Sequence, residues 1–168
     1  MNILMVLSDQ TLPHDRRVER QARDLIRDGH RLFLLARQGR DQPPEEVFNN
    51  IHVIRLNWPF LNRNKLLSDL IYWIFQRYLI YFTIVKACRK HVIGAIHVHD
   101  LPYAYAASKA AKKLRLPLIF DMHENYPVLF ETGFKIRHHR LIWPFFHLIL
   151  FLLKREEKTA CRQADQII

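Results

Sequence analysis

Three short segments of the chain bring together side chains that could do chemistry. Residues 97–100 (HVHD) and 121–125 (DMHEN) combine imidazoles, carboxylates and an amide, and residues 9–15 (DQTLPHD) add two more carboxylates and another imidazole. Such groups can orient the hydroxyls of a ligand or bind a metal ion. They cannot by themselves hold a pyrophosphate. The candidate site residues from these segments are Asp9, His99, Asp100, His123, Glu124 and Asn125.

Alternating strand and helix patterns place these three segments at one edge of a sheet. Such βαβ units predict a mostly parallel sheet with helices on both faces. Right-handed crossovers then predict a Rossmann-like, doubly wound three-layer α/β/α domain of about six strands in the order 3-2-1-4-5-6. Ligands bind outside the carboxyl ends of such strands, at the switch point between the first and fourth strands. We expect strands at 3–8, 31–36, 51–56, 95–99, 117–122 and 165–168, helices at 18–28, 66–91, 101–116 and 140–163, and a loop at 38–50.

The polar residues at this edge also have structural interpretations. Asp15 and Asp100 precede predicted helices and could cap them, which would not exclude a second role. His97 and His99 share one face of the fourth strand. We interpret His97 as a satisfied structural histidine and assign site roles to His99 and His123. A metal site is an alternative, with His99, Asp100, His123 and Glu124 as ligands. These residues match no compact metal-ligand signature, so we predict no metal ion.

Glycine content, charge and cysteine usage narrow the chemistry further. The four glycines are scattered singly, whereas a phosphate-binding loop needs about two or three of them in a cluster. The net charge of +10 comes without a zinc-finger, RNP or basic-zipper pattern, so we expect no nucleic-acid partner. Cys88 and Cys161 fall in helical patterns, which indicates reduced thiols. The N-terminus lacks the basic region of a signal peptide, which favours a cytoplasmic chain.

Two acid-free stretches, residues 70–99 and 132–155, mix basic and aromatic side chains. The 13-residue apolar run at 141–153 is shorter than the roughly 20 residues that span a bilayer. Basic and aromatic residues together suit an interfacial helix, and residues 70–85 are apolar on more sides than one buried face requires. We therefore predict peripheral contact with an anionic membrane surface, at the inner face of the cell membrane. The alternative is that both helices only pack on the sheet.

Five motifs occur along nearly the whole chain in a fixed order. They are residues 15–25 (DRRVERQARDL), 28–32 (DGHRL), 97–102 (HVHDLP), 120–124 (FDMHE), and Glu157 followed by 164–168 (ADQII). In this order they resemble the N-terminal domain of GT-B glycosyltransferases, in the large glycosyltransferase family 4 group. Each motif alone is weak, and the ordered set carries the resemblance.

The resemblance implies that residues 1–168 form one acceptor-binding domain, the N-terminal half of a GT-B fold. A C-terminal domain, absent from this chain, would hold most of the nucleotide-sugar. The implied reaction moves a sugar from that donor to a glycan or lipid-linked acceptor of the cell envelope, with retention and without a metal or other cofactor. His123 matches the family's histidine that reaches the donor sugar, and His99 and Asp100 match an acceptor-side segment. The loop after the first strand lacks the family's glycines, so His14 or Arg16 would contribute there instead.

Two other functions stay open on the sequence alone. One is a sugar-nucleotide epimerase of the same fold, and the other is a non-catalytic, membrane-associated partner of a separate donor-binding subunit. The acidic donor motif and the Arg/Lys pair of the family's second domain do not occur in the chain. We therefore expect a hexosyltransferase-like enzyme of which this domain is a part, inactive in isolation.

Overall fold

The computed structural model describes residues 1–7, 16–39, 41–56, 65–137 and 143–168. Within them, one seven-stranded sheet has the order β3-β4-β2-β1-β5-β6-β7. The strands are β1 (Asn2–Leu7), β2 (Arg31–Arg37), β3 (Glu45–Phe48), β4 (Ile51–Leu56), β5 (Ala95–His99), β6 (Leu118–Asp121) and β7 (Gln166–Ile167). Leaving β3 aside, this is the doubly wound 3-2-1-4-5-6 order expected from the sequence, and every neighbouring pair is parallel.

The strand β3 corrects the expectation of a loop across residues 38–50. It pairs antiparallel with β4 and closes that edge of the sheet. Asn49 and Asn50 form the two-residue connection, both with positive φ (48° and 64°), as a tight hairpin turn of this kind requires. Lys90 also donates a hydrogen bond to Glu45 on this strand, over 2.7 Å. The sequence signal was the Asn-Asn pair, which the neighbouring Pro43 and Pro44 obscured.

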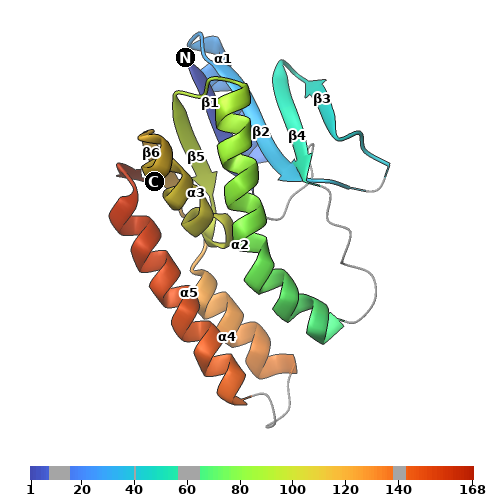
Figure 1. Cartoon of the computed structure of the whole chain (residues 1–168), viewed down its shortest axis with the longest axis vertical. Coiled ribbons are helices and arrows are strands. Elements are labelled where there is room, and N and C mark those ends of the chain that lie inside the picture. Colours follow the sequence, from blue (N-terminus) through green and yellow to red (C-terminus); the bar gives the residue numbers. More distant parts are fainter. Residues whose placement is uncertain (8–15, 40, 57–64, 138–142) are drawn as a thin grey trace.

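Helices cover both faces of the sheet, as the three-layer prediction requires. They are α1 (Arg16–Arg27), α2 (Lys65–Lys90), α3 (Leu101–Leu114), α4 (Tyr126–Arg137) and α5 (Trp143–Gln163). Helix α1 packs on one face, over a core that includes Met5, Val18 and Leu34. Helices α2, α3 and α5 cover the other face, over the larger core that includes Leu4, Ile84 and Phe120. Figure 1 shows α4 and the first turns of α2 and α5 extending beyond the carboxyl ends of the strands.

Helix α4 is absent from the sequence-based expectation. Its segment carries Pro127 and Gly133, and few of its residues repeat at a helical spacing. The helix begins because Asn125 accepts a hydrogen bond from the Val128 amide through its side-chain oxygen, at 3.2 Å. Pro127 then occupies an early helical position, where its missing N–H has no cost. Helix α4 packs against α5 rather than on the sheet.

Two local features concern Gly29 and the cysteines. Gly29 ends α1 with φ of 83°, and its amide donates to the Ile26 carbonyl at 3.0 Å. Cys88 and Cys161 are free thiols, and burial raises the pKa of Cys88 to about 12, so that thiol stays protonated. None of the described helices is long and apolar enough to cross a membrane.

Candidate active site

The register of β1, β5 and β6 brings the polar residues of two strands to one face of the sheet. His99 pairs with Leu7 on one side and with Asp121 on the other. Because side chains alternate along a strand, Val98 and Phe120 point into the larger core. His97, His99 and Asp121 point to the opposite face, which α1 covers. All three are buried, with at most 5% of each residue exposed.

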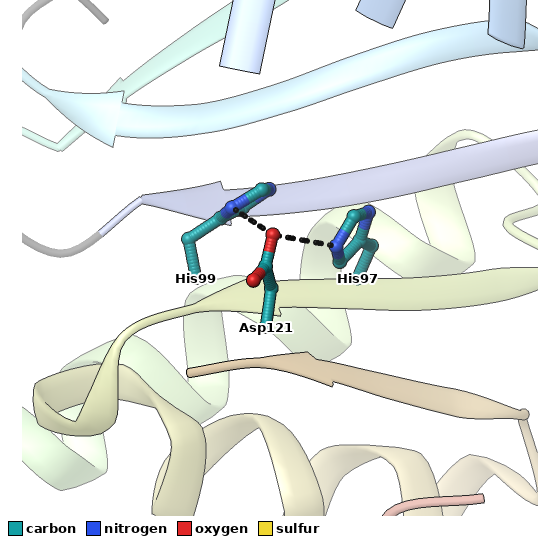
Figure 2. A group of neighbouring side chains, drawn as sticks. All are labelled: His97, His99 and Asp121. Atoms are coloured by element: carbon teal, nitrogen blue, oxygen red, sulfur yellow. Dashed lines mark ion pairs between the residues drawn. The ribbon is translucent and has the colours of Figure 1, made fainter. Parts of the chain in front are cut away.

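The carboxylate of Asp121 is the centre of this group. Its Oδ2 atom lies 3.0 Å from Nε2 of His123, 3.4 Å from Nδ1 of His99 and 3.8 Å from Nε2 of His97. Figure 2 shows His97 and His99 on either side of Asp121. The same oxygen accepts a hydrogen bond of 2.9 Å from the side-chain amide of Gln21 on α1. One buried carboxylate therefore organises three imidazoles at the carboxyl edge.

The three imidazoles differ in exposure and in their contacts. His97 and His99 have ring centres 4.3 Å apart, and His99 and His123 stack with centres 5.9 Å apart. Burial lowers the pKa of His97, and the charge of Asp121 only partly offsets that effect. His97 is therefore neutral at pH 7. His123 has the most exposed side chain of the three, at 20%. It is the imidazole that a ligand outside the strand ends would meet first.

Asp100 joins this group through the backbone. It occupies the N-cap position of α3, but its side chain makes no capping hydrogen bond, so the capping interpretation is wrong. Its amide donates to the Asp121 carbonyl at 3.0 Å, and its backbone has φ of 66° and ψ of 157°. Its Oδ1 atom is buried without a partner among the described residues. Burial raises the pKa of this carboxyl above its usual range, and the charges of His123 and Arg17 offset that effect only in part.

A comparison with protein families shows to which family this domain, with its polar group at the carboxyl edge of the sheet, belongs. The model of the glycosyl transferase 4-like domain matches residues 14–168. The chain belongs to this family. Comparison with curated proteins returned no match. Both the resemblance read from the five motifs and the Rossmann-like fold are thus confirmed.

The other expected site residues of this glycosyl transferase 4-like domain have less defined surroundings. Glu124 and Asn125 are exposed just beyond β6, and Asn125 also caps α4, a role that the sequence did not indicate. Arg16 is exposed at the first residue of α1. Asp9, His14 and the proposed helix cap Asp15 lie outside the described residues.

A metal ion in this glycosyl transferase 4-like domain would use a different ligand set from the one considered above. Ligand atoms of His97, His99 and Asp121 all lie within 4.8 Å of one another, a set of two imidazoles and one carboxylate that suits a transition metal. The Asp121 oxygen in that set already contacts Gln21 and His123. The carboxylate therefore has protein partners with or without an ion.

Two residues of the group were missed by sequence reasoning. Asp121 was visible as a carboxylate two positions before His123, at the end of an otherwise apolar strand, and that position indicates burial. Gln21 gave no signal, because it lies on α1, a hundred positions from its partner. His97 is buried, as expected of a structural histidine. It is not the satisfied histidine that we expected, because its Nε2 has no hydrogen-bond partner in the described part of the chain.

Proposed function

We propose that this domain is the acceptor-binding half of a glycosyltransferase that moves a sugar from a nucleotide-sugar to a glycan or lipid-linked acceptor. The observation that supports it most is the contact between His123 and the buried Asp121 carboxylate, at 3.0 Å, on the carboxyl edge of a glycosyl transferase 4-like domain. In a doubly wound sheet this edge, next to the switch point, is where ligands bind.

The Asp121 carboxylate, 3.0 Å from Nε2 of His123, is placed to orient that imidazole. A carboxylate facing Nε2 favours the tautomer with its proton on that nitrogen. The lone pair of Nδ1 is then available to accept a hydrogen bond from a sugar hydroxyl. Gln21 donates a hydrogen bond to this carboxylate, and the rings of His97 and His99 lie beside it. A preorganised imidazole of this kind costs no rearrangement when the sugar arrives.

Asp100 is the second group that we assign to the substrate. Its Oδ1 is buried without a partner among the described residues, and its side chain caps no helix. A carboxylate in this position can accept hydrogen bonds from the hydroxyl that is to be glycosylated and hold it in line with the donor. The leaving phosphate needs cationic or amide groups that we assign to a donor-binding half. We propose retention, no metal requirement, and a cytoplasmic site of action.

The test compares two histidine variants in the full-length enzyme, with turnover measured against a panel of nucleotide-sugars. His123→Ala should lower turnover by about 100-fold or more, the effect of losing one preorganised polar group at a reacting centre. His30→Ala is the matched control, because His30 is half-buried at the opposite, amino edge of the sheet. Equal turnover in the two variants, with both folded by circular dichroism, would remove His123 from the mechanism. Turnover by residues 1–168 alone would contradict the division of the site between two halves.

A further inference from the structure

The outer face of the α2–α3–α5 layer carries an exposed apolar stripe on α2. Phe75, Tyr78, Leu79 and Phe82 are 48–64% exposed, and their spacing of three and four residues places them on one side of the helix. The opposite side is buried against the sheet and includes Ile80, Ile84 and Cys88. Helix α2 thus presents large apolar side chains to both sides, whereas an ordinary surface helix is apolar on only one.

Helix α5 repeats this arrangement. Leu148 is 54% exposed and Phe151 is 61% exposed, while Phe146, Leu150 and Leu153 are buried on the other side of the helix. Arg77 of α2 reaches Glu156 of α5 in a salt bridge of 2.7 Å, which ties the two helices together across α3. The two helices are thus held in one layer, and each presents exposed apolar side chains away from the core.

A groove between α2 and α3 continues this surface. Its volume is about 420 Å³, and its lining includes Tyr78, Tyr81, Phe82, Tyr105 and Lys109. The ammonium group of Lys109 lies 5.3 Å from the ring centre of Tyr105. Aromatic rings beside an amine suit the boundary between lipid headgroups and acyl chains, where aromatic side chains concentrate.

The charge of this face has one sign. Its exposed basic residues are Lys86 and Arg89 on α2, Lys109, Lys112 and Lys113 on α3, and Lys154, Arg155 and Lys158 on α5. The described side chains of α2 and α3 include no carboxylate. Glu156 on α5 is buried and paired with Arg77, and Glu157 is half-buried. A second copy of this chain would bring the same positive charge against this face, so self-association does not suit it.

We propose that the outer face of α2, α3 and α5 docks on an anionic membrane surface. The exposed side chains of Phe82 and Phe151 enter the headgroup region, and the lysines and arginines around them contact lipid phosphates. This mode of binding combines an apolar part, which salt does not screen, with an electrostatic part, which salt does screen. Other aromatic residues of α2 and α5 have side chains outside the described part of the structure, among them Tyr72, Trp73 and Trp143.

The test uses co-sedimentation with vesicles of phosphatidylcholine alone or mixed with phosphatidylglycerol, at low and high salt. The charge variant is K154Q/R155Q/K158Q on α5. Its control is R20Q/R23Q/R27Q, which removes the same three charges from exposed positions of α1, on the other side of the sheet. Each basic residue that reaches the lipid contributes about fivefold in affinity. We expect the α5 variant to lose tenfold or more and the α1 variant to bind as the original chain does.

The apolar part is tested with F82S/F151S, whose two side chains are more than half exposed, so the fold should not depend on them. This variant should lose the binding that remains at high salt and keep a weaker, salt-sensitive binding. The proposal is overturned if the α1 and α5 charge variants weaken binding equally, since only net charge would then matter. Binding too weak to measure with every vesicle, or a chain that forms dimers through this face in gel filtration, would also overturn it.

Discussion

Two regions of this domain depart in opposite directions from the usual division into apolar interior and polar surface. At the carboxyl ends of β5 and β6, the polar side chains of His97, His99 and Asp121 are almost completely buried. On the outer side of α2 and α5, Phe75, Phe82 and Phe151 are more than half exposed. Burying polar groups costs stability unless they are paired, and large exposed apolar patches mark sites of interaction. Each departure is therefore the basis of one of the two proposals made above.

The two regions also differ in how their residues are held. Asp121 receives contacts from α1, β5 and the segment after β6, so the buried group depends on the whole fold. The exposed stripe of α2 has no such buried polar contacts and lies on the outer side of the helix. Substitutions in the first region should therefore change stability and chemistry together, and those in the second should change binding alone. The predictions below separate the two.

The largest expected effect compares neighbours on α2. Ile80 is fully buried and Leu79 is 48% exposed, although they are adjacent in sequence. Ile80→Ala should lower the free energy of unfolding by about 2–5 kcal/mol, because it leaves a cavity in the core. Leu79→Ala should change it by less than about 0.5 kcal/mol. Urea unfolding of both variants measures this, and equal losses would show that Leu79 belongs to the core.

The next effect concerns Asp121, which we treat as a positioning residue acting through His123. Asp121→Asn should lower kcat by about 100-fold, since a misplaced reactive group costs about that much. KM should change little. A variant that unfolds, or a folded one whose kcat is unchanged, would indicate a purely structural role.

A smaller effect is the pH dependence of stability contributed by His97. Burial holds its folded pKa below the usual 6.5, with Asp121, His99 and His123 around it. The unfolded chain therefore binds the proton more readily, and stability present above pH 6.5 is lost as the pH falls toward the folded pKa. Thermal melts of His97→Gln across this range should show a shallower loss than the original chain. A steeper loss in the variant would contradict this account.

The smallest expected effect is that of a chelator. Because Asp121 already has Gln21 and His123 as partners, the site needs no ion to satisfy its carboxylate. Turnover of the full-length enzyme should stay unchanged in EDTA. Suppose instead that EDTA removes turnover, that Zn²⁺ restores it, and that Zn²⁺ restores none in His97→Gln. His97, His99 and Asp121 would then be identified as a metal centre.

The sequence indicated the larger features of this fold because they rest on patterns that repeat over many residues. Runs such as 31–36 and 95–99 are apolar strands separated by helical patterns, and topology rules then supplied the strand order. It was less informative where one local contact decides the structure. The Asn49-Asn50 turn creates β3, and the Asn125 cap starts α4 in a segment with little helical pattern.

The candidate site also has parts that repeating sequence patterns predict and parts that depend on single contacts. The edge of the sheet that gathers His99, Asp100 and His123 follows from the alternation of elements, so it could be expected from the sequence. The partners of Asp121 could not, because Gln21 meets it only through the packing of α1 on the sheet. Capping by Asp100 was a reasonable expectation for an aspartate before a helix. Its backbone angles turn the side chain to other surroundings.

Those backbone angles have an evolutionary consequence. With φ of 66° and ψ of 157°, Asp100 occupies a region that glycine adopts easily and that costs other residues about 1–3 kcal/mol. A mutation to glycine would relieve that strain, so a lineage that no longer used the carboxylate would gain stability by losing it. Selection on fold alone thus pushes this position toward glycine, whereas the substrate role that we propose for Asp100 would keep the aspartate. On that proposal, the residue at position 100 would distinguish diverging descendants of this gene that still act on a substrate from those that have ceased to.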